Sequence, residues 1–345
     1  MKNYLFILSV LLATVFVIGC QKEAITPQAA QSQPEVQELF SPCPIPIKSH
    51  NVQFTPGDTV RNTIIIDGES REYLIYVPRF YDAWWTQSYA YPVVFMFHGN
   101  GQNAVRMADG NITGWSALSE TENFIVIYPK GWYYDMLSGS QENRFATANS
   151  VTKIAATEHL RDDVKFIKSI RKGLLKKLRT NCERYYACGF SNGGSFVKTE
   201  VKINMDDLFA ATTSCGGIGL QVPLTPAHGM QRPHFEVVGE NDGPVFDKFY
   251  TPGPTNVPVN CGNWDTEPFY YVLENMATTM GFTTGPACFF NNTSNLSMYL
   301  WGSFWAPGLA YRFRMIPNMG HKYPGTDTQK DFTIDFWNFL EGYTL

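Results

Sequence analysis

Short runs of mostly apolar residues constrain the fold more than any other feature of this sequence. A strand is apolar at nearly every position when both of its faces are buried, as in a parallel sheet. A predicted hairpin, formed by residues 63–69 and 71–77 around a Gly-containing turn, precedes these runs. The runs that predict buried strands are residues 92–97, 124–128, 185–190, 235–239 and 311–316.

Segments with helical periodicity lie between and after these runs. Over residues 158–178, apolar side chains recur at intervals close to three or four, and Lys and Arg fill the other face. Phe332, Phe336 and Phe339 form a similar stripe near the end of the chain. Strands that alternate with amphipathic helices predict an α/β protein with a mostly parallel central sheet. We find no internal repeat or second linker, so we expect one domain over residues 43–345.

The N-terminal residues 1–20 predict an export signal and not a part of the fold. Lys2 is followed by an apolar run at residues 4–18, which is short for a membrane span and suits a signal-peptide core. The run ends in Val-Ile-Gly-Cys, which resembles the bacterial lipobox and marks Cys20 for lipidation. Residues 21–42 are rich in Gln, Ala, Pro and Ser and predict a flexible tether. We therefore expect an outer-membrane lipoprotein that faces the periplasm or the surface, or a secreted protein.

The charge and the cysteine content restrict the classes of partner and the cellular compartment that we expect. The net charge is −4 and there is no long basic run, so a nucleic-acid partner is not expected. Beyond Cys20 the cysteines number six, which permits up to three disulfides in an exported chain. Cys188 lies in a predicted buried strand, where a free thiol is an equal alternative. No pair has the spacing of a metal site, so no metal is expected.

The strongest chemical motif is Gly189-Phe190-Ser191-Asn192-Gly193, which stands between a predicted strand and a predicted helix. A nucleophile elbow needs this context, because the turn is tight and the residues two positions from the Ser must be small. The Ser is then exposed at a helix N-terminus, where the helix dipole favours negative charge. We therefore predict Ser191 as a catalytic nucleophile.

A nucleophilic Ser needs a base, and the base needs an orienting carboxylate. In the α/β-hydrolase fold the order along the chain is Ser, acid, His. His321 follows the last predicted strand and is the predicted base, whereas His228 and His234 have weaker positions. Asp242 follows the preceding strand and is the predicted acid. Glu240 and Asp247 are the alternatives to Asp242.

An oxyanion hole needs two backbone N–H donors. Asn192 follows the nucleophile and is expected to supply one of them. The loop His98-Gly99-Asn100 follows another strand, and its glycine lets the backbone approach a substrate closely. Asn100 is the predicted second donor, with Gly99 as the alternative, and His98 is expected to shape the loop.

Aromatic residues follow one of the predicted strands and recur in a Pro- and Gly-rich stretch at residues 243–268. They either pack on the domain or form a stacking platform for a phenolic or sugar group. The stretch itself is a candidate lid or cleft wall. The residues predicted to bind substrate are Trp132, Tyr133 and Trp264.

Taken together, the motifs resemble the polyhydroxybutyrate depolymerase and feruloyl esterase group of α/β-hydrolases. The matching stretches run from about residue 60 to the end and include Arg161-Asp162-Asp163-Val164, Gly189-Phe190-Ser191-Asn192-Gly193-Gly194 and Asn318-Met319-Gly320-His321. The family often has His-Gly-x-x-Asp at the acid, whereas this chain has Val238-Gly239-Glu240-Asn241-Asp242, which keeps the Asp but replaces the His.

The resemblance implies a Ser-Asp-His esterase that needs no cofactor and acts on hydroxyalkanoate, feruloyl or acetyl esters, including those of polysaccharides. Two other functions compete with this one. A serine peptidase of the same fold usually carries an extra domain to gate access, for which the chain has little room. A surface glycan-binding lipoprotein without catalysis would have a broken triad.

Overall fold

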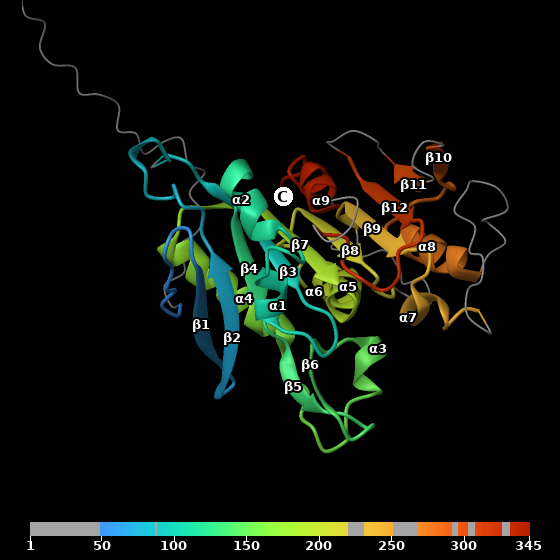
Figure 1. Cartoon of the computed structure of the whole chain (residues 1–345), viewed down its shortest axis with the longest axis horizontal. Coiled ribbons are helices and arrows are strands. Elements are labelled where there is room, and N and C mark those ends of the chain that lie inside the picture. The colour runs from blue at the N-terminus through green and yellow to red at the C-terminus, as the bar shows by residue number, and fades with distance from the viewer. Residues whose placement is uncertain are drawn as a thin grey trace, which may run out of the picture. The chain divides into compact units, whose positions relative to one another are not determined.

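A 10-stranded sheet forms the centre of the described chain, in the order β1-β2-β4-β3-β7-β8-β9-β12-β11-β10 (Figure 1). The computed structural model describes residues 49–86, 88–219, 231–250, 268–291, 296–302, 308–325 and 332–345, all within the unit Pro42–Leu345. The strands of this sheet are β1 (Thr59–Ile66), β2 (Glu69–Tyr76), β3 (Tyr91–Phe97), β4 (Ile125–Pro129), β7 (Thr180–Phe190), β8 (Ala211–Cys215), β9 (His234–Gly239), β10 (Ala287–Asn291), β11 (Leu296–Gly302) and β12 (Ala310–Ile316).

The interior of the sheet is parallel and its edges are antiparallel. Strands β4, β3, β7, β8, β9 and β12 pair in parallel, which confirms the interpretation of the apolar runs. At one edge β1 and β2 form the predicted hairpin, and β2 pairs antiparallel with β4. At the other edge β11 and β10 are added antiparallel to β12. All parallel strands therefore end at one side of the sheet, where loops that carry reactive groups can meet.

Helices cover both faces of the sheet, so alternate residues of each strand enter different cores. In β3, Val94 and Met96 pack with Trp115 of α2, whereas Val93 and Phe95 pack with Phe166 of α4. The helical segments are η2 (Trp84–Thr86), α1 (Ala104–Ala108), α2 (Trp115–Glu122), α3 (Ala148–Val151), α4 (Asp163–Lys177), α5 (Asn192–Phe196), η3 (Val197–Val201), α6 (Lys202–Asn204), α7 (Gly243–Phe246), α8 (Pro268–Thr279) and α9 (Phe332–Leu340).

Several elements differ from the sequence prediction, including the unpredicted strands β5 (Trp132–Asp135), β6 (Gln141–Arg144), β10 and β11. Helix α4 begins at Asp163 and not near residue 158, because the side chain of Asp162 accepts the backbone N–H of Lys165 and caps the helix there. Strand β8 (Ala-Thr-Thr-Ser-Cys) was not predicted, although it is buried at every position between β7 and β9. A small separate hairpin, formed by β5 and β6, projects beyond the main sheet (Figure 1).

Candidate active site

Ser191 stands at the turn between β7 and α5, as the motif predicts. Its φ of 52° and ψ of −113° lie outside the regions that non-glycine residues normally adopt. The strained backbone is held by a hydrogen bond from the Ser191 N–H to the Cys215 carbonyl, at 2.8 Å. A strained residue held by its surroundings is typical of functional positions.

The glycines on either side of Ser191 are required by close backbone contacts. A Cβ atom on Gly189 would lie 2.3 Å from the carbonyl oxygen of Gly193, and one on Gly193 would lie 2.4 Å from that of Phe97. Backbone atoms cannot move aside as a flexible side chain can. The turn therefore forms only with glycine at both positions, which is the physical basis of the motif.

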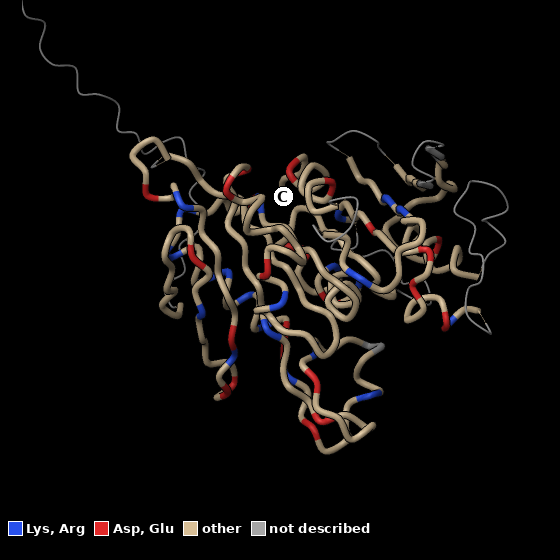
Figure 2. The backbone as a smooth tube through the Cα atoms, in the orientation of Figure 1, with Lys and Arg blue, Asp and Glu red and all other residues tan. Residues whose placement is uncertain are grey.

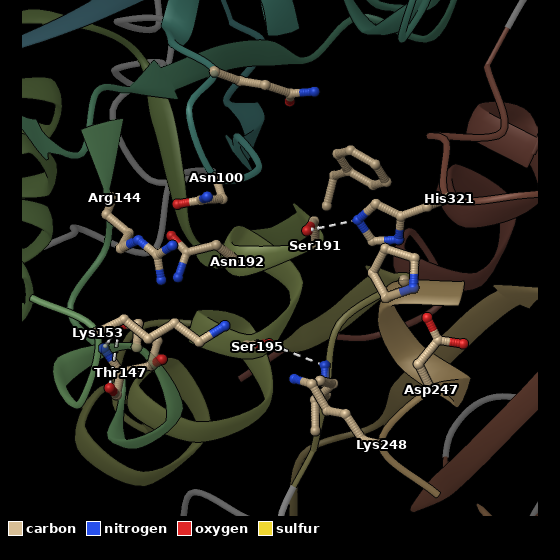
Figure 3. Close-up of a pocket in the computed structure, with 16 residues that line it drawn as sticks. Asn100, Arg144, Thr147, Lys153, Ser191, Asn192, Ser195, Asp247, Lys248 and His321 are labelled. Atoms are coloured by element: carbon tan, nitrogen blue, oxygen red, sulfur yellow. Dashed lines mark hydrogen bonds between the residues drawn. The ribbon is translucent and has the colours of Figure 1, made fainter. Parts of the chain in front are cut away.

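Ser191, His321 and Asp242 form one hydrogen-bonded row, although they are far apart in the sequence. Figure 3 shows the part of this row between Ser191 and His321. The distance from His321 Nε2 to Ser191 Oγ is 2.8 Å, and that from His321 Nδ1 to Asp242 Oδ1 is 2.7 Å. The Asp242 side chain is 1% exposed, whereas that of His321 is 23% exposed. Asp242 also caps α7 through Val245 N–H. This row can pass the hydroxyl proton of Ser191 to the imidazole.

Two of the alternative acids and bases, Glu240 and His234, have other partners, whereas Asp247 lines the cleft. Glu240 accepts the backbone N–H of Asn318, at 2.8 Å. His234 is buried between the hydroxyls of Thr212 and Ser214, and burial lowers its pKa strongly. His228 lies outside the described residues.

The predicted oxyanion donors lie on the cleft beside Ser191 (Figure 3). The side chain of Asn192 accepts the N–H of Phe145 at 2.8 Å and donates to its carbonyl at 3.1 Å, which fixes the residue that follows the nucleophile. The N–H of Gly99 is already donated to Gln102 Oε1, at 3.1 Å. Of the two loop residues considered, this geometry favours Asn100 over Gly99.

His98 has the structural role expected of it. Its Nε2 accepts the N–H of Gly131 at 2.9 Å, so Nδ1 carries the proton and donates to the Gly99 carbonyl at 2.7 Å. Burial lowers the pKa of His98 to about 4, so the ring is neutral at pH 7. The imidazole thus joins the Gly99 loop to the segment after β4.

A cleft of about 590 Å³ opens above Ser191 (Figure 3). Its walls come from the loop after β3, the end of β6, the α3 region, the elbow and the segment around α7. Most of the lining side chains are polar, and they include three cations that sequence reasoning missed. The lining residues are Asn100, Gln102, Arg144, Thr147, Ser150, Lys153, Phe190, Ser191, Asn192, Ser195, Gly216, Ile218, Pro244, Asp247, Lys248 and His321.

Trp132 and Tyr133, which the sequence predicts to bind substrate, are not among the residues that line this cleft. They line a separate hollow of about 190 Å³ together with Arg71. The guanidinium of Arg161 stacks over the Trp132 ring, 4.3 Å from its centroid. The structure thus places Trp132 in the packing of the β5–β6 hairpin. Trp264 lies outside the described residues.

The described residues also bear on the disulfides predicted from the sequence and on the presence of membrane-spanning helices. Cys188 and Cys215 are free buried thiols, so the expected maximum of three disulfides is too high. None of the helices in the described ranges is both long and apolar enough to cross a membrane. Cys20 and the tether at residues 21–42 lie outside the described residues.

Comparisons with known proteins place this geometry in context. No protein-family model matches the chain. The bifunctional acetylxylan esterase/xylanase of Neocallimastix patriciarum is 22% identical over 268 residues, which are 74% of this chain and 31% of that protein. The chain therefore spans about a third of the length of this curated relative.

Solved structures resemble the chain over most of its length. An acetyl xylan esterase from Aspergillus awamori matches with a TM-score of 0.56 and 14% identity, covering 82% of this chain and 99% of its own. An S-formylglutathione hydrolase from Agrobacterium tumefaciens matches with a TM-score of 0.52 and 12% identity, covering 85% and 99%. The chain therefore has the α/β-hydrolase fold, with a mostly parallel sheet flanked by helices.

Proposed function

We propose that this protein is a serine carboxylic ester hydrolase with Ser191 as nucleophile, His321 as base and Asp242 as orienting acid. The observation that carries the proposal is the hydrogen-bonded row of the three side chains at the mouth of a cleft. A binding protein without catalysis has no need for the strained backbone of Ser191. The curated relative is named an acetylxylan esterase/xylanase and one of the solved structures described above an acetyl xylan esterase, which supports the same reaction class.

In the first half of the reaction, His321 Nε2 takes the proton of the Ser191 hydroxyl as its oxygen attacks the ester carbonyl. Asp242 holds the imidazole in the tautomer with its proton on Nδ1 and stabilises the imidazolium that forms. The backbone amides of Asn192 and Asn100 stabilise the oxyanion, each by roughly 3 kcal/mol. His321 then gives its proton to the leaving alcohol.

In the second half, water takes the place of the alcohol. His321 removes a proton from the water, which attacks the acyl carbonyl of the ester on Ser191. The backbone amides of Asn192 and Asn100 stabilise the second tetrahedral intermediate as they did the first. The acid product leaves when His321 returns the proton to Ser191 Oγ. Every step uses groups of the chain itself, so the proposed reaction requires no cofactor.

The proposed substrates are acetyl, feruloyl or hydroxyalkanoate esters, including those carried by a polysaccharide. The curated relative is named an acetylxylan esterase/xylanase, and one solved structure with a TM-score of 0.50 is named a ferulic acid esterase. The resemblance to polyhydroxybutyrate depolymerases rests on the sequence motifs alone. We propose no nucleic-acid partner.

We further propose export to the bacterial envelope, with a lipid on Cys20 as the sole membrane anchor and residues 21–42 as the tether. The outer membrane is the proposed site, with secretion as the alternative. We also propose that Cys182 and Cys288 each take part in a disulfide, as an oxidising compartment would allow. Metabolic labelling with a radioactive fatty acid tests the anchor, because Cys20→Ala should abolish the label and retained label would contradict the proposal.

The enzymatic proposal is tested with a panel of p-nitrophenyl acetate, p-nitrophenyl butyrate, methyl ferulate, acetylated xylan and a hydroxybutyrate oligomer. The purified protein should hydrolyse at least one of them, and Ser191→Ala should not. The preferred ester identifies the substrate class. Hydrolysis that survives in Ser191→Ala, or a folded protein inactive on every ester, would contradict the proposal.

A further inference from the structure

The charge of the cleft is opposite to that of the chain. The whole sequence has a net charge of −4, and Lys and Arg are interspersed with Asp and Glu over most of the backbone (Figure 2). The described lining of the cleft contains three cations, Arg144, Lys153 and Lys248, and only one carboxylate, Asp247, besides His321. A cleft lined by one sign of charge concentrates ligands of the opposite sign.

Arg144 is the fixed member of the three. It ends β6 and is 7% exposed, yet its Nε atom has no hydrogen-bond partner. Its Nη2 donates to Glu142 at 3.0 Å, and Glu142 also receives hydrogen bonds from Ser140 and Asn100. The carboxylate that pairs with Arg144 is therefore shared among several donors. A buried guanidinium with unused donor capacity is a strong site for an anionic oxygen.

Lys153 and Lys248 extend into the same cleft from different segments (Figure 3). Lys153 follows α3 and Lys248 follows α7, and neither forms an ion pair with another described residue. Burial lowers the pKa of Lys248, and repulsion from Lys153 and Arg144 lowers it further. All three cations line the one cleft, and Lys248 is repelled by the other two, so an anion bound there would relieve that repulsion.

We propose that the cleft selects esters that carry a carboxylate, and that Arg144, Lys153 and Lys248 bind this group while Ser191 attacks the ester carbonyl. This inference rests on the proposed function. A neutral ester leaves Lys153 and Lys248 without an anionic partner among the described residues, whereas a carboxylate gains charge-assisted hydrogen bonds in a partly enclosed cleft. The carboxylate can belong to the acyl part, as in a monoester of a dicarboxylic acid, or to the alcohol part, as in an ester of an acidic sugar.

Two matched pairs of substrates test the inference and separate these sources. Mono-p-nitrophenyl adipate is compared with p-nitrophenyl hexanoate for a carboxylate on the acyl side. Chlorogenic acid, a caffeoyl ester with a carboxylate on its alcohol, is compared with methyl caffeate. In at least one of the two pairs, the kcat/KM of the anionic ester should be about tenfold higher than that of its neutral counterpart, which corresponds to about 1.4 kcal/mol. Addition of 0.5 M NaCl should reduce this preference.

The double variant Lys153→Gln/Lys248→Gln should reduce the ratio of anionic to neutral kcat/KM at least fivefold. Lys177→Gln, on an exposed lysine near the end of α4, is the matched control and should leave the ratio unchanged. A ratio near one in both pairs, with the neutral esters hydrolysed, would overturn the carboxylate site and leave the ester hydrolase intact. The carboxylate site would also be overturned if the double variant had the same ratio of anionic to neutral kcat/KM as the wild type.

If no ester is hydrolysed, the proposed function fails and the site is tested by binding alone. Calorimetric titration of Ser191→Ala with monomethyl adipate should show binding that the two Lys→Gln substitutions weaken about tenfold. Titration with dimethyl adipate, which lacks the charge, should show binding at least tenfold weaker. Equal binding of the two adipates, or no loss in the lysine variants, would overturn the inference.

Discussion

Residues of the cleft at Ser191 and of the hollow at Trp132 were both predicted from the sequence to contact substrate, but only the cleft contains a hydroxyl that is bonded to a base. In the cleft, the hydroxyl of Ser191 is partly exposed and bonded to a base, and Arg144 has an unused donor. At the hollow, the guanidinium of Arg161 lies over the Trp132 ring and bonds Glu69 at 2.7 Å. At the hollow, Arg71 Nη1 also lacks a hydrogen-bond partner. The hydroxyl bonded to a base, and not unused bonding capacity, therefore distinguishes the cleft from the hollow.

The hollow also stands over a buried ion pair. Arg71 Nη2 lies 2.5 Å from Asp163 Oδ1, and both side chains are 2% exposed. The other oxygen of Asp163 accepts the N–H of Ala146, at 2.8 Å. The Arg71 guanidinium also lies over the ring of Phe166, 4.2 Å from its centroid. These contacts join β2, α4 and the segment after β6, so substitutions here should affect stability and not catalysis.

The largest expected effect is on catalysis at the cleft. Ser191→Ala should reduce kcat on p-nitrophenyl butyrate by about 10⁴-fold or more, because the nucleophile is lost. The thermal midpoint should change little, since the backbone turn remains. Ser116→Ala, which removes a hydroxyl bonded to Tyr128, is the matched control and should keep kcat within about twofold. Comparable losses in both variants would contradict the role of Ser191.

Asp242→Asn should reduce kcat by about 10³–10⁴-fold. The amide cannot stabilise the imidazolium, and it favours the wrong tautomer of His321. Asn remains a good N-cap for α7, so the loss should appear in activity and not in the denaturation midpoint. Activity within tenfold of the wild type would show that Asp242 does not orient the base.

Arg71→Met should decrease the free energy of unfolding by about 3–5 kcal/mol, because Asp163 is left buried without its cation. Urea denaturation measures the change, and the kcat of the folded protein should be unaffected. Arg61→Met, at an exposed ion pair with Glu72, should cost less than about 1 kcal/mol. A large loss of kcat in folded Arg71→Met would remove the distinction between the two regions.

The stability loss in Arg71→Met should depend on pH with a defined sign. Burial raises the pKa of Asp163, and Arg71 opposes this rise. Without Arg71 the folded state holds the proton more tightly than the unfolded state, so stability falls as pH rises through the raised pKa. The difference between variant and wild type should therefore be smaller at pH 4 than at pH 7. A difference independent of pH would show that Asp163 is not the cause.

The smallest expected effect is that of Trp132→Leu. Loss of the stacking with Arg161 should lower stability by about 1 kcal/mol, as measured by urea denaturation. The kcat/KM for methyl ferulate should stay within about twofold of the wild type, because Trp132 lies outside the cleft. A tenfold increase in KM for methyl ferulate would restore the sequence prediction of a stacking platform.

The sequence predicted the parallel core because β3, β4 and β7 are buried on both faces and must be apolar. It did not predict β8, whose Thr213 and Ser214 are polar yet completely buried. The Ser214 hydroxyl bonds His234 of the next strand, a contact that exists only once the sheet has formed.

The candidate site, like the fold, could be predicted from the sequence only in part. Ser191, Asp242 and His321 follow strands and could be predicted from their order along the chain. Arg144 ends a hairpin, and Lys153 and Lys248 follow two short helices. None of these segments carries a motif, and only the fold brings the three residues together. A charged cleft built from separate segments has no local pattern in the sequence.

The most direct test of the central claim is covalent labelling with diethyl p-nitrophenyl phosphate, which phosphorylates activated serines. Peptide mass spectrometry should find a single diethylphosphoryl group, located on Ser191, with release of one equivalent of p-nitrophenol. The reaction should be much slower in Asp242→Asn. A folded protein that is not labelled, or is labelled at another residue at the same rate in both proteins, would contradict Ser191 as the nucleophile.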